Sequence, residues 1–318
     1  MEQHYVGIDV AKDSFVAFFN NKTQEFKNTK KGINSFIKHL PNNSWCIMEA
    51  TGNYSVRLAL ALYDKNIRVS VVNPLQIKRF SQTKLSRTKT DHVDAKIIAE
   101  YGLRMQPDDY CPEPDFIRYL KQKRTILKRL IKTRTAYSNQ IHALQQLPDT
   151  DKEALKACKK LIKITAEQIQ LLEKSMANII EKYCQKEFLA LKSIAGIGEK
   201  SAIEIIIVSG LFYNFSSAKQ FIAFIGACPS INQSGTSISK VKGISKVGQS
   251  YTRSLLYMAA LTAITKNKPC QVFYQRLIEK GKPKKVAIIA VMNKLIKQAF
   301  AIVKSGEPFN PDFQPKFS

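Results

Sequence analysis

The chain has 318 residues, of which 44% are hydrophobic, enough for two or three globular domains, each with its own core. Its 50 Lys and Arg residues outnumber 25 Asp and Glu residues, so the formal net charge is +25, which predicts a polyanionic partner with nucleic acid as the first candidate. No apolar run approaches the roughly 20 residues of a membrane-spanning helix, and the first residues do not resemble a signal peptide. We therefore expect a cytoplasmic, nucleoid-associated protein without a membrane partner.

The six cysteines lie far apart, none belongs to a CxxC pair, and only four histidines accompany them. This spacing does not predict a zinc-type cluster. We expect free, mostly buried thiols in a reducing compartment. The cysteines are Cys46, Cys111, Cys158, Cys184, Cys228 and Cys270.

The first part of the chain alternates short β-type runs with helical stretches. The runs HYVGIDV, SFVAFFN and QEFKN are close enough to form a meander. The runs SWCIMEA and IRVSVVN follow, separated by helical patterns at residues 33–40 and 54–64, and a further helix is expected from about 91 to 103. We predict an α/β domain over residues 1–108, with a mixed sheet that is antiparallel at one edge and parallel beyond it.

A basic helical region follows a linker. Residues 106–114 (QPDDYCPEP) contain three prolines and three acidic residues, which predicts the linker. From about 116 to 186 the chain is amphipathic with a helical period, and LPDTD at 147–151 interrupts it, which predicts two antiparallel helices. We assign residues 109–187 to a helical coiled-coil segment.

Eight basic residues and no acidic one lie between Arg118 and Arg134. Like charges without compensation fit a track for RNA or DNA phosphates, and a solvated coiled-coil face is the alternative. The predicted contacts are Arg118, Lys121, Arg124, Lys128 and Arg129.

The last part, residues 188–306, is predicted to be mostly helical, with helices at about 251–265 and 283–304 and an irregular tail at 307–318. It opens with LKSIAGIGEKSA, in which Gly196 and Gly198 are typical of a helix-hairpin-helix turn whose backbone N–H groups approach a phosphate. A tight helix connection without a ligand is the alternative. Residues 229–248 are rich in Gly and Ser and are expected to form a loop. Residues 238–304 hold fourteen Lys or Arg and one acid, Glu279.

Four carboxylates have a pattern that points to a metal site. Asp9 in GIDVAKDSFV and Glu49 in WCIMEATGNY each end an apolar strand, where a charge is costly to bury without a partner. Asp91 and Asp94 in TKTDHVDAKIIAEY are three residues apart, which puts both on one face of a helix.

Four acids at one edge of a sheet would repel one another, and cations would cancel that repulsion. Mg²⁺ prefers oxygen ligands, and two such ions, roughly 3.5–4 Å apart, support phosphoryl transfer. Asp9 has other interpretations, as a turn cap or as part of an actin-like phosphate loop, and Asp13 and Asp64 are nearby alternatives. Asp91 also has an alternative interpretation, as the cap of a helix.

The segments GIDVAKD, MEATGNY and TKTDHVDAKIIAEY resemble the three N-terminal blocks of the IS110-family transposases. This resemblance implies a RuvC-like domain with an RNase H-like fold and a DEDD metal site. Residue by residue, that site consists of Asp9, Glu49, Asp91 and Asp94, holding Mg²⁺ as a two-ion site.

The stretch 227–260, beginning ACPSINQSGTS, resembles the C-terminal transposase block of the same family. In that block a serine directly before glycine is the nucleophile, which corresponds to Ser234 before Gly235. Ser230, Ser237, Ser239 and Ser245 compete in the same segment, and Thr236 stands where relatives often have a second glycine. Four nearby cations could assist attack on a phosphodiester: Lys240, Lys242, Lys246 and Arg253. Lys12, in the first part of the chain, is predicted to be a further nucleic-acid contact.

The resemblance implies a DNA transposase or recombinase that joins Ser234 transiently to a DNA end. It also implies a structured bridge RNA that selects donor and target DNA, and a homo-oligomer, dimer or tetramer, in which one subunit's serine meets another's carboxylates. A metal-dependent nuclease of the Holliday-junction-resolvase kind, with water as nucleophile, is the first alternative. A non-catalytic nucleic-acid-binding protein is the second, and an actin-like ATPase is the third.

Overall fold

The computed structural model describes residues 3–84, 90–234, 238–245 and 247–311, and for residues 230–242 it describes the backbone alone. The chain divides into two compact units, Met1–Pro112 and Glu113–Ser318. The division falls inside the segment expected to be a linker. The boundary expected at 187/188 lies beside a kink at Cys184 (φ −150, ψ 38) in the helix 152–193, and the residues on both sides of it belong to the second unit.

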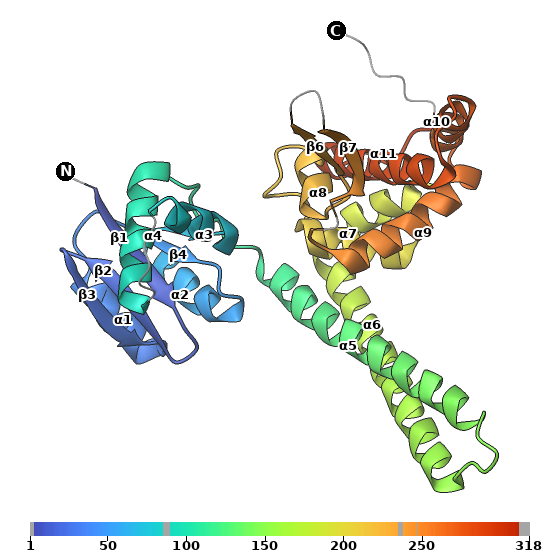
Figure 1. The fold of residues 1–318 in the computed structure, drawn as a ribbon, viewed down its shortest axis with the longest axis horizontal. Helices are drawn as coiled ribbons and strands as arrows, with labels where there is room; N and C mark the ends of the chain where they lie inside the picture. Colours follow the sequence, from blue (N-terminus) through green and yellow to red (C-terminus); the bar gives the residue numbers. More distant parts are fainter. Residues whose placement is uncertain (1–2, 85–89, 235–237, 246, 312–318) are drawn as a thin grey trace. The chain divides into compact units, whose positions relative to one another are not determined.

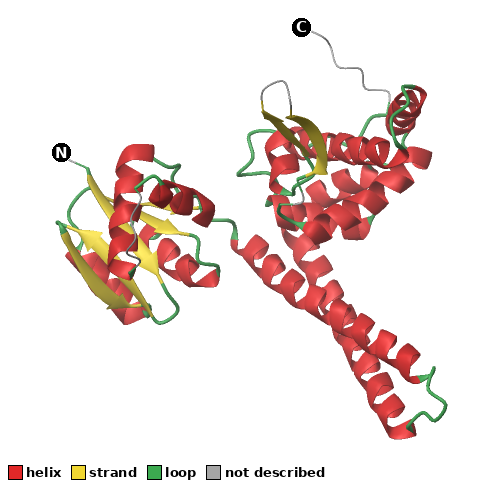
Figure 2. Cartoon of the chain, in the orientation of Figure 1, coloured by secondary structure: helices red, strands yellow, loops and turns green. Residues whose placement is uncertain are grey.

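The first unit contains a five-stranded mixed sheet (Figure 2). Its strands are β1 (His4–Val10), β2 (Ser14–Phe19), β3 (Lys22–Lys27), β4 (Ser44–Glu49) and β5 (Arg68–Val72). They are arranged in the order β3-β2-β1-β4-β5. The pairs β1/β2 and β2/β3 are antiparallel, and the pairs β1/β4 and β4/β5 are parallel. The predicted mixed sheet is therefore confirmed, and it is compatible with an RNase H-like domain.

Four helices belong to this sheet. They are α1 (Lys30–His39), α2 (Asn53–Tyr63), α3 (Pro74–Gln82) and α4 (Asp91–Met105). Phe36 of α1 and Leu58 of α2 share a buried cluster with Phe15 on one sheet face. Ile98 of α4 shares a second cluster with Ile47. Two layers of helix thus cover opposite faces of the sheet.

Helix α4 packs directly on the backbone of β1. A Cβ at Gly7 would lie closer than 3.0 Å to backbone atoms of Ala95 and Ala99. A Cβ at Gly102 would meet the end of the Ile47 side chain, which can move aside. Gly7 is therefore the position at which close contact between helix and sheet requires glycine.

The second unit begins with two long helices, α5 (Asp115–Leu144) and α6 (Lys152–Ser193), which lie side by side (Figure 1). The break between them contains the predicted interruption at 147–151. The remaining elements are α7 (Glu199–Ser209), α8 (Ala218–Phe224), β6 (Pro229–Ser234), β7 (Ile238–Ile244), α9 (Ser250–Lys266), α10 (Lys268–Glu279) and α11 (Lys284–Ser305). One large apolar cluster joins α5, α6, α7, α8, α9, α10 and α11.

Among the described residues, α11 is the one helix long and apolar enough to cross a membrane by length and composition. Its buried face includes Val291, Leu295 and Ala299, which lie in the core cluster of this unit. This burial is what a core helix requires, and the same helix was predicted at 283–304.

Candidate active site and nucleic-acid contacts

Asp9 and Glu49 lie next to each other at the carboxyl ends of two parallel strands. Ile8 of β1 pairs with Met48 of β4, so the next residue of each strand continues the same register. Neighbouring strands are about 4.8 Å apart, which brings the two backbones close enough for both carboxylates to reach one ligand. Both acids are partly exposed.

The two acids also share a face of the sheet. Side chains alternate along a strand, and Ile8 and Met48 point into the cluster under α1 and α2. Gly7 and Ile47 face α4 instead. Because Asp9 and Glu49 are two residues beyond these positions, they lie on the α4 face.

Helix α4 carries the other two predicted acids toward that end of the sheet. Ala95 lies over Gly7, whereas Gly102 lies over Tyr5 and Ile47, so the helix runs back along β1. Its first turn therefore lies beyond Gly7, toward the end of β1 where Asp9 is found.

The start of α4 is fixed by its cap and favoured by its charges. The Thr90 hydroxyl oxygen accepts a hydrogen bond from Val93 N–H at 3.3 Å, and Asp91 and Asp94 occupy the first turn, where the helix dipole favours carboxylates. Asp94 is partly buried and shares its helical stripe with Ile98, which packs toward β4, whereas Asp91 is exposed. Thr90 is thus the N-cap, so the cap interpretation does not apply to Asp91.

The two alternative acids lie elsewhere in the first unit. Asp13 is exposed in the turn between β1 and β2, and Asp64 is the exposed C-cap of α2. Within the described ranges, no three acidic, His or Cys side chains are arranged to hold a metal ion. The structure thus places Asp9 and Glu49 at one end and one face of the sheet, with the first turn of α4 toward that end, and no three of the described side chains gather around a common point.

The turn before α7 shows two glycines with different roles. Gly196 has φ +106, and a Cβ there would lie 2.7 Å from the Cβ of Ala263 in α9. Gly198 is the N-cap of α7 with φ −82, and a Cβ there would meet nothing within 4 Å. Gly196 is required by packing, whereas the space over Gly198 remains open to a ligand.

Part of the basic stretch at the start of α5 is paired within its own unit. Arg118 forms an ion pair with Asp115, and Lys121 with Glu113. Sequence reasoning missed these partners because the two acids precede the basic stretch, inside or beside the expected linker. Arg129 is exposed and continues the predicted surface.

Two other members of the basic stretch face the interior. Arg124 donates from both Nε and Nη2 to the carboxylate of Glu204 in α7, and its side chain is only 13% exposed. The ammonium of Lys128 lies 5.1 Å from the ring centre of Tyr251, and burial lowers its pKa, with nearby Arg124 acting in the same direction. Arg124 is therefore committed to a buried network rather than to a surface track.

The segment expected to be a Gly- and Ser-rich loop forms a β-hairpin. Ser234 is the last residue of β6 and pairs with Ile238 across the hairpin. Lys240 and Lys242 lie on β7, opposite Asn232 and Ser230. Gly235, Thr236, Ser237 and Lys246 lie outside the described residues.

Arg253 braces the base of this hairpin. Its Nη1 donates to the carbonyl oxygen of Ile225 at 2.6 Å, and Asn293 of α11 donates to the carbonyl of Ala227 at 3.4 Å. Gly226 has φ +74, and a Cβ there would collide with the backbone of Val247. The hairpin is thus held where it leaves the helical core.

Comparison with known proteins identifies the family. Residues 6–147 match a DEDD transposase family of the IS110 type, and residues 189–275 match the transposase family IS116/IS110/IS902. The chain is 33% identical to the "Pilin gene-inverting protein" of Moraxella lacunata and 32% identical to that of Moraxella bovis, over 98% of each chain. It is 23% identical to a "Probable family 20 transposase" of Pseudomonas aeruginosa over 96% of this chain and 98% of the relative. The chain therefore belongs to the IS110 family of transposases and is a DNA transposase/recombinase enzyme.

Proposed function

We propose that this protein cleaves and exchanges DNA strands through a covalent serine–DNA intermediate, with Mg²⁺ held by Asp9, Glu49, Asp91 and Asp94 in an RNase H-like first unit. The observation that carries the proposal is the placement of Asp9 and Glu49 at adjacent strand ends, on the face toward which α4 brings its first turn.

The donor set fits a hard divalent cation. All four side chains offer carboxylate oxygens, which Mg²⁺ prefers, and Asp9 and Glu49 are close enough in the sheet to share a ligand. When bound, Mg²⁺ supplies charge stabilisation at the phosphoryl oxygens. The chain's own part is to hold the acids at one sheet end, while Gly7 lets α4 approach.

Ser234 is the proposed nucleophile. Its hydroxyl attacks the phosphorus of a DNA phosphodiester, a serine–phosphate ester bond forms, and a phosphorus–oxygen bond of the strand breaks. The serine proton leaves to a base, and the released deoxyribose hydroxyl takes up a proton. A hydroxyl at another DNA end then attacks the ester, which restores the serine and completes strand exchange. Lys240, Lys242, Lys246 and Arg253 are the proposed cations around this step.

The remaining parts of the proposal concern partners. A net charge of +25, the open backbone at Gly198 and exposed basic residues such as Arg129 support binding of polyanions. We infer a bridge RNA that selects donor and target DNA, a homo-oligomer that joins the serine of one subunit to the carboxylates of another, and association with the nucleoid.

Covalent trapping tests this function. Full-length protein is incubated with Mg²⁺, end-labelled element DNA and RNA transcribed from the flanking non-coding region, and labelled protein is digested so that the modified peptide is identified by mass. Ser234→Ala is compared with Ser239→Ala, which changes a serine on the neighbouring strand of the same hairpin.

The expected result is a DNA adduct on Ser234 that Ser234→Ala abolishes and Ser239→Ala retains. Full DNA cleavage by Ser234→Ala, without any adduct, would favour a hydrolytic nuclease instead. Nucleic-acid binding by wild-type protein, without any cleavage or exchange under these conditions, would favour the binding-protein alternative.

A further inference from the structure

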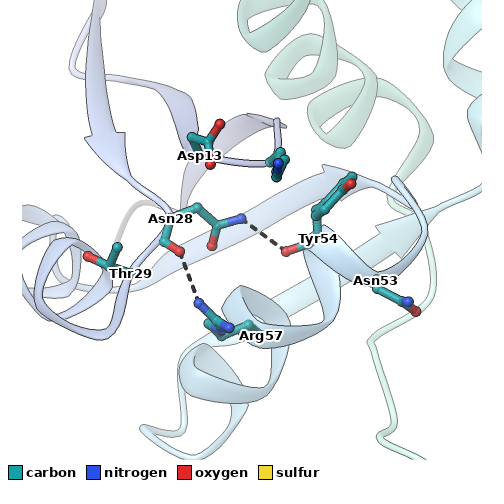
Figure 3. A pocket seen from close by; sticks show the side chains of 7 residues that line it. Asp13, Asn28, Thr29, Asn53, Tyr54 and Arg57 are labelled. Atoms are coloured by element: carbon teal, nitrogen blue, oxygen red, sulfur yellow. Dashed lines mark hydrogen bonds between the residues drawn. The ribbon is translucent and has the colours of Figure 1, made fainter. Parts of the chain in front are cut away.

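A pocket in the first unit lies beside the starts of α1 and α2, the helices that cover the sheet face opposite α4. It has a volume of about 350 Å³ and is lined by Lys12, Asp13, Asn28, Thr29, Asn53, Tyr54 and Arg57 (Figure 3). These residues come from the β1–β2 turn and from the starts of α1 and α2. None of them is among the four acids of the proposed metal site.

The pocket favours an anion. Lys12 and Arg57 contribute two positive charges against the single carboxylate of Asp13. The first turns of α1 and α2 contain no acidic residue, and the N-cap of α2, Gly52, supplies no side-chain cap. Two helix N-termini beside two cations form a suitable environment for a phosphate.

Asn28 adds an independent requirement for a hydrogen-bond donor. Asn28 is only 7% exposed, and its side-chain Nδ2 donates to the carbonyl oxygens of Ala11 at 3.0 Å and Tyr54 at 3.2 Å. These two acceptors fix the orientation of the amide, because a flipped amide would place its oxygen against two carbonyls. Asn28 lines the pocket, and its buried Oδ1 has no hydrogen-bond partner among the described residues.

Arg57 holds the backbone of the same residue. Its Nη1 donates to the carbonyl oxygen of Asn28 at 3.2 Å (Figure 3). Asn28 therefore ties the β1–β2 turn to the start of α2 through both its side chain and its backbone. A buried acceptor in so rigid a setting costs free energy unless a ligand donates to it.

A ligand for this pocket must be an anion that also carries a hydroxyl. We propose that the pocket binds a ribonucleotide unit of an RNA strand, with the phosphate at Lys12 and Arg57 and the 2′-hydroxyl donating to Asn28 Oδ1. In RNA each phosphate has a 2′-hydroxyl beside it, and that hydroxyl distinguishes RNA from DNA. Tyr54, which is 47% exposed at the pocket, offers a ring on which the base can stack.

The inference deepens the proposed function, since it rests on this protein binding nucleic acid, and it is tested by binding rather than by catalysis. Fluorescence anisotropy measures the affinity of the full-length protein for an oligouridine and for the 2′-deoxyuridine strand of equal length. We expect tighter binding of the RNA by about five-fold, the worth of roughly one hydrogen bond.

Three variants locate the effect. Lys12→Gln should weaken binding of RNA more than Lys38→Gln, which removes an equal charge from the exposed last turn of α1, away from the pocket. Asn28→Ala should bring the ratio of RNA to DNA affinity close to one. Because Asn28 also supports the fold, the thermal stability of this variant is measured alongside its binding. Photocrosslinking of 4-thiouridine RNA to wild-type protein provides a second readout.

The expected crosslink is at Tyr54 or Lys12. The inference is overturned if Lys12→Gln and Lys38→Gln behave alike, if the crosslinks lie outside the pocket, or if DNA and RNA bind wild type equally. A ribonucleoside monophosphate that competes as well as the strand would instead make this a site for free nucleotides. Any of these results can occur while Ser234 still forms its DNA adduct. The experiments therefore distinguish failure of the pocket proposal from failure of the proposed serine mechanism.

Discussion

Arg124 and Glu204, 80 residues apart in the sequence, form a bidentate ion pair in the interior of the second unit. Their side chains are 13% and 4% exposed, and the Thr252 hydroxyl donates to the same carboxylate at 2.6 Å. The network thereby connects α5, α7 and α9. It links the arm to the turn at Gly198 and to the helix that follows the serine hairpin.

Glu204→Gln should destabilise the second unit by about 3–5 kcal/mol, because it leaves a buried guanidinium without its counter-charge. Urea unfolding followed by far-ultraviolet circular dichroism measures the loss of helix. The single tryptophan, Trp45, is buried in the first unit and serves as an internal control, since its fluorescence transition should not move. A pair of apolar replacements, Arg124→Met with Glu204→Leu, should recover much of the loss. An unchanged helical transition in Glu204→Gln would contradict the role of the pair.

Gly7→Ala should destabilise the first unit by about 1–3 kcal/mol or more, because the new methyl group collides with the backbone of Ala95 and Ala99. Trp45, which shares the α4 cluster, reports this unfolding by fluorescence. Gly198→Ala, where a methyl group meets nothing within 4 Å, is the matched control and should leave the Trp45 transition in place. Equal midpoints for all three proteins would show that α4 does not depend on this close approach.

Asp9→Asn should lower Mg²⁺-dependent strand cleavage by roughly 100-fold or more, because the metal contributes several kcal/mol to such reactions. Salt-sensitive DNA binding should remain near that of wild type, since it depends on basic residues. Cleavage of labelled DNA and filter binding measure the two properties. Asp64→Asn changes an exposed acid at the end of α2 and should leave both intact. If Asp9→Asn cleaved DNA as fast as the wild-type protein, Asp9 would not be a ligand of the metal.

Gly198→Ala should weaken nucleic-acid binding by roughly tenfold, because the added methyl group lies between the α7 N-terminus and a phosphate that accepts its hydrogen bonds. The stability cost of the same change should stay below about 1 kcal/mol, as for an N-cap replacement. Gly196→Ala should show the opposite pattern, with a large loss of stability from contact with Ala263. Anisotropy and urea unfolding distinguish these roles. If Gly198→Ala bound normally, the turn would be a connection without a ligand.

Alkylation of the cysteines should follow their burial. Burial raises the pKa of Cys270 to about 11 and that of Cys184 to about 12, and it raises the pKa of the Cys46 thiol as well. A pKa near 11 leaves about one thiol in a thousand ionised at pH 8. Iodoacetamide should therefore modify exposed Cys111 first, and modification of Cys270 should rise as the pH approaches 11. Peptide mass spectrometry measures the order, and early labelling of Cys46 would contradict the packing of β4.

The sequence was sufficient for the elements whose signals are local. Strand alternation and helical periodicity predicted the mixed sheet, the helix that starts at Asp91 and the interrupted arm. The four acids remain a prediction: strand ends and a three-residue helical spacing bring them toward one end of the sheet, but no three of the described acidic side chains are arranged around a common point. Helix α3 was missed although Asn73 caps it and Pro74 occupies its first turn, which is a readable start signal.

Features that depend on distant partners could not be predicted from the sequence. The basic stretch of α5 looked uncompensated because Glu204 lies in another helix. The β6–β7 hairpin was read as a loop because its Gly and Ser content outweighed its short alternation. Asn28 Oδ1 is left without a hydrogen-bond partner because folding brings three segments of the chain together, and no spacing in the sequence predicts this.

The close contact of α4 with the backbone at Gly7 sets how near the helix and β1 approach at that point. Beside it, the side chains of Ile47 and Ile98 pack between α4 and the sheet. Substitutions of these apolar side chains can therefore alter the tilt of α4, whereas any side chain at Gly7 would push the helix away from the strand.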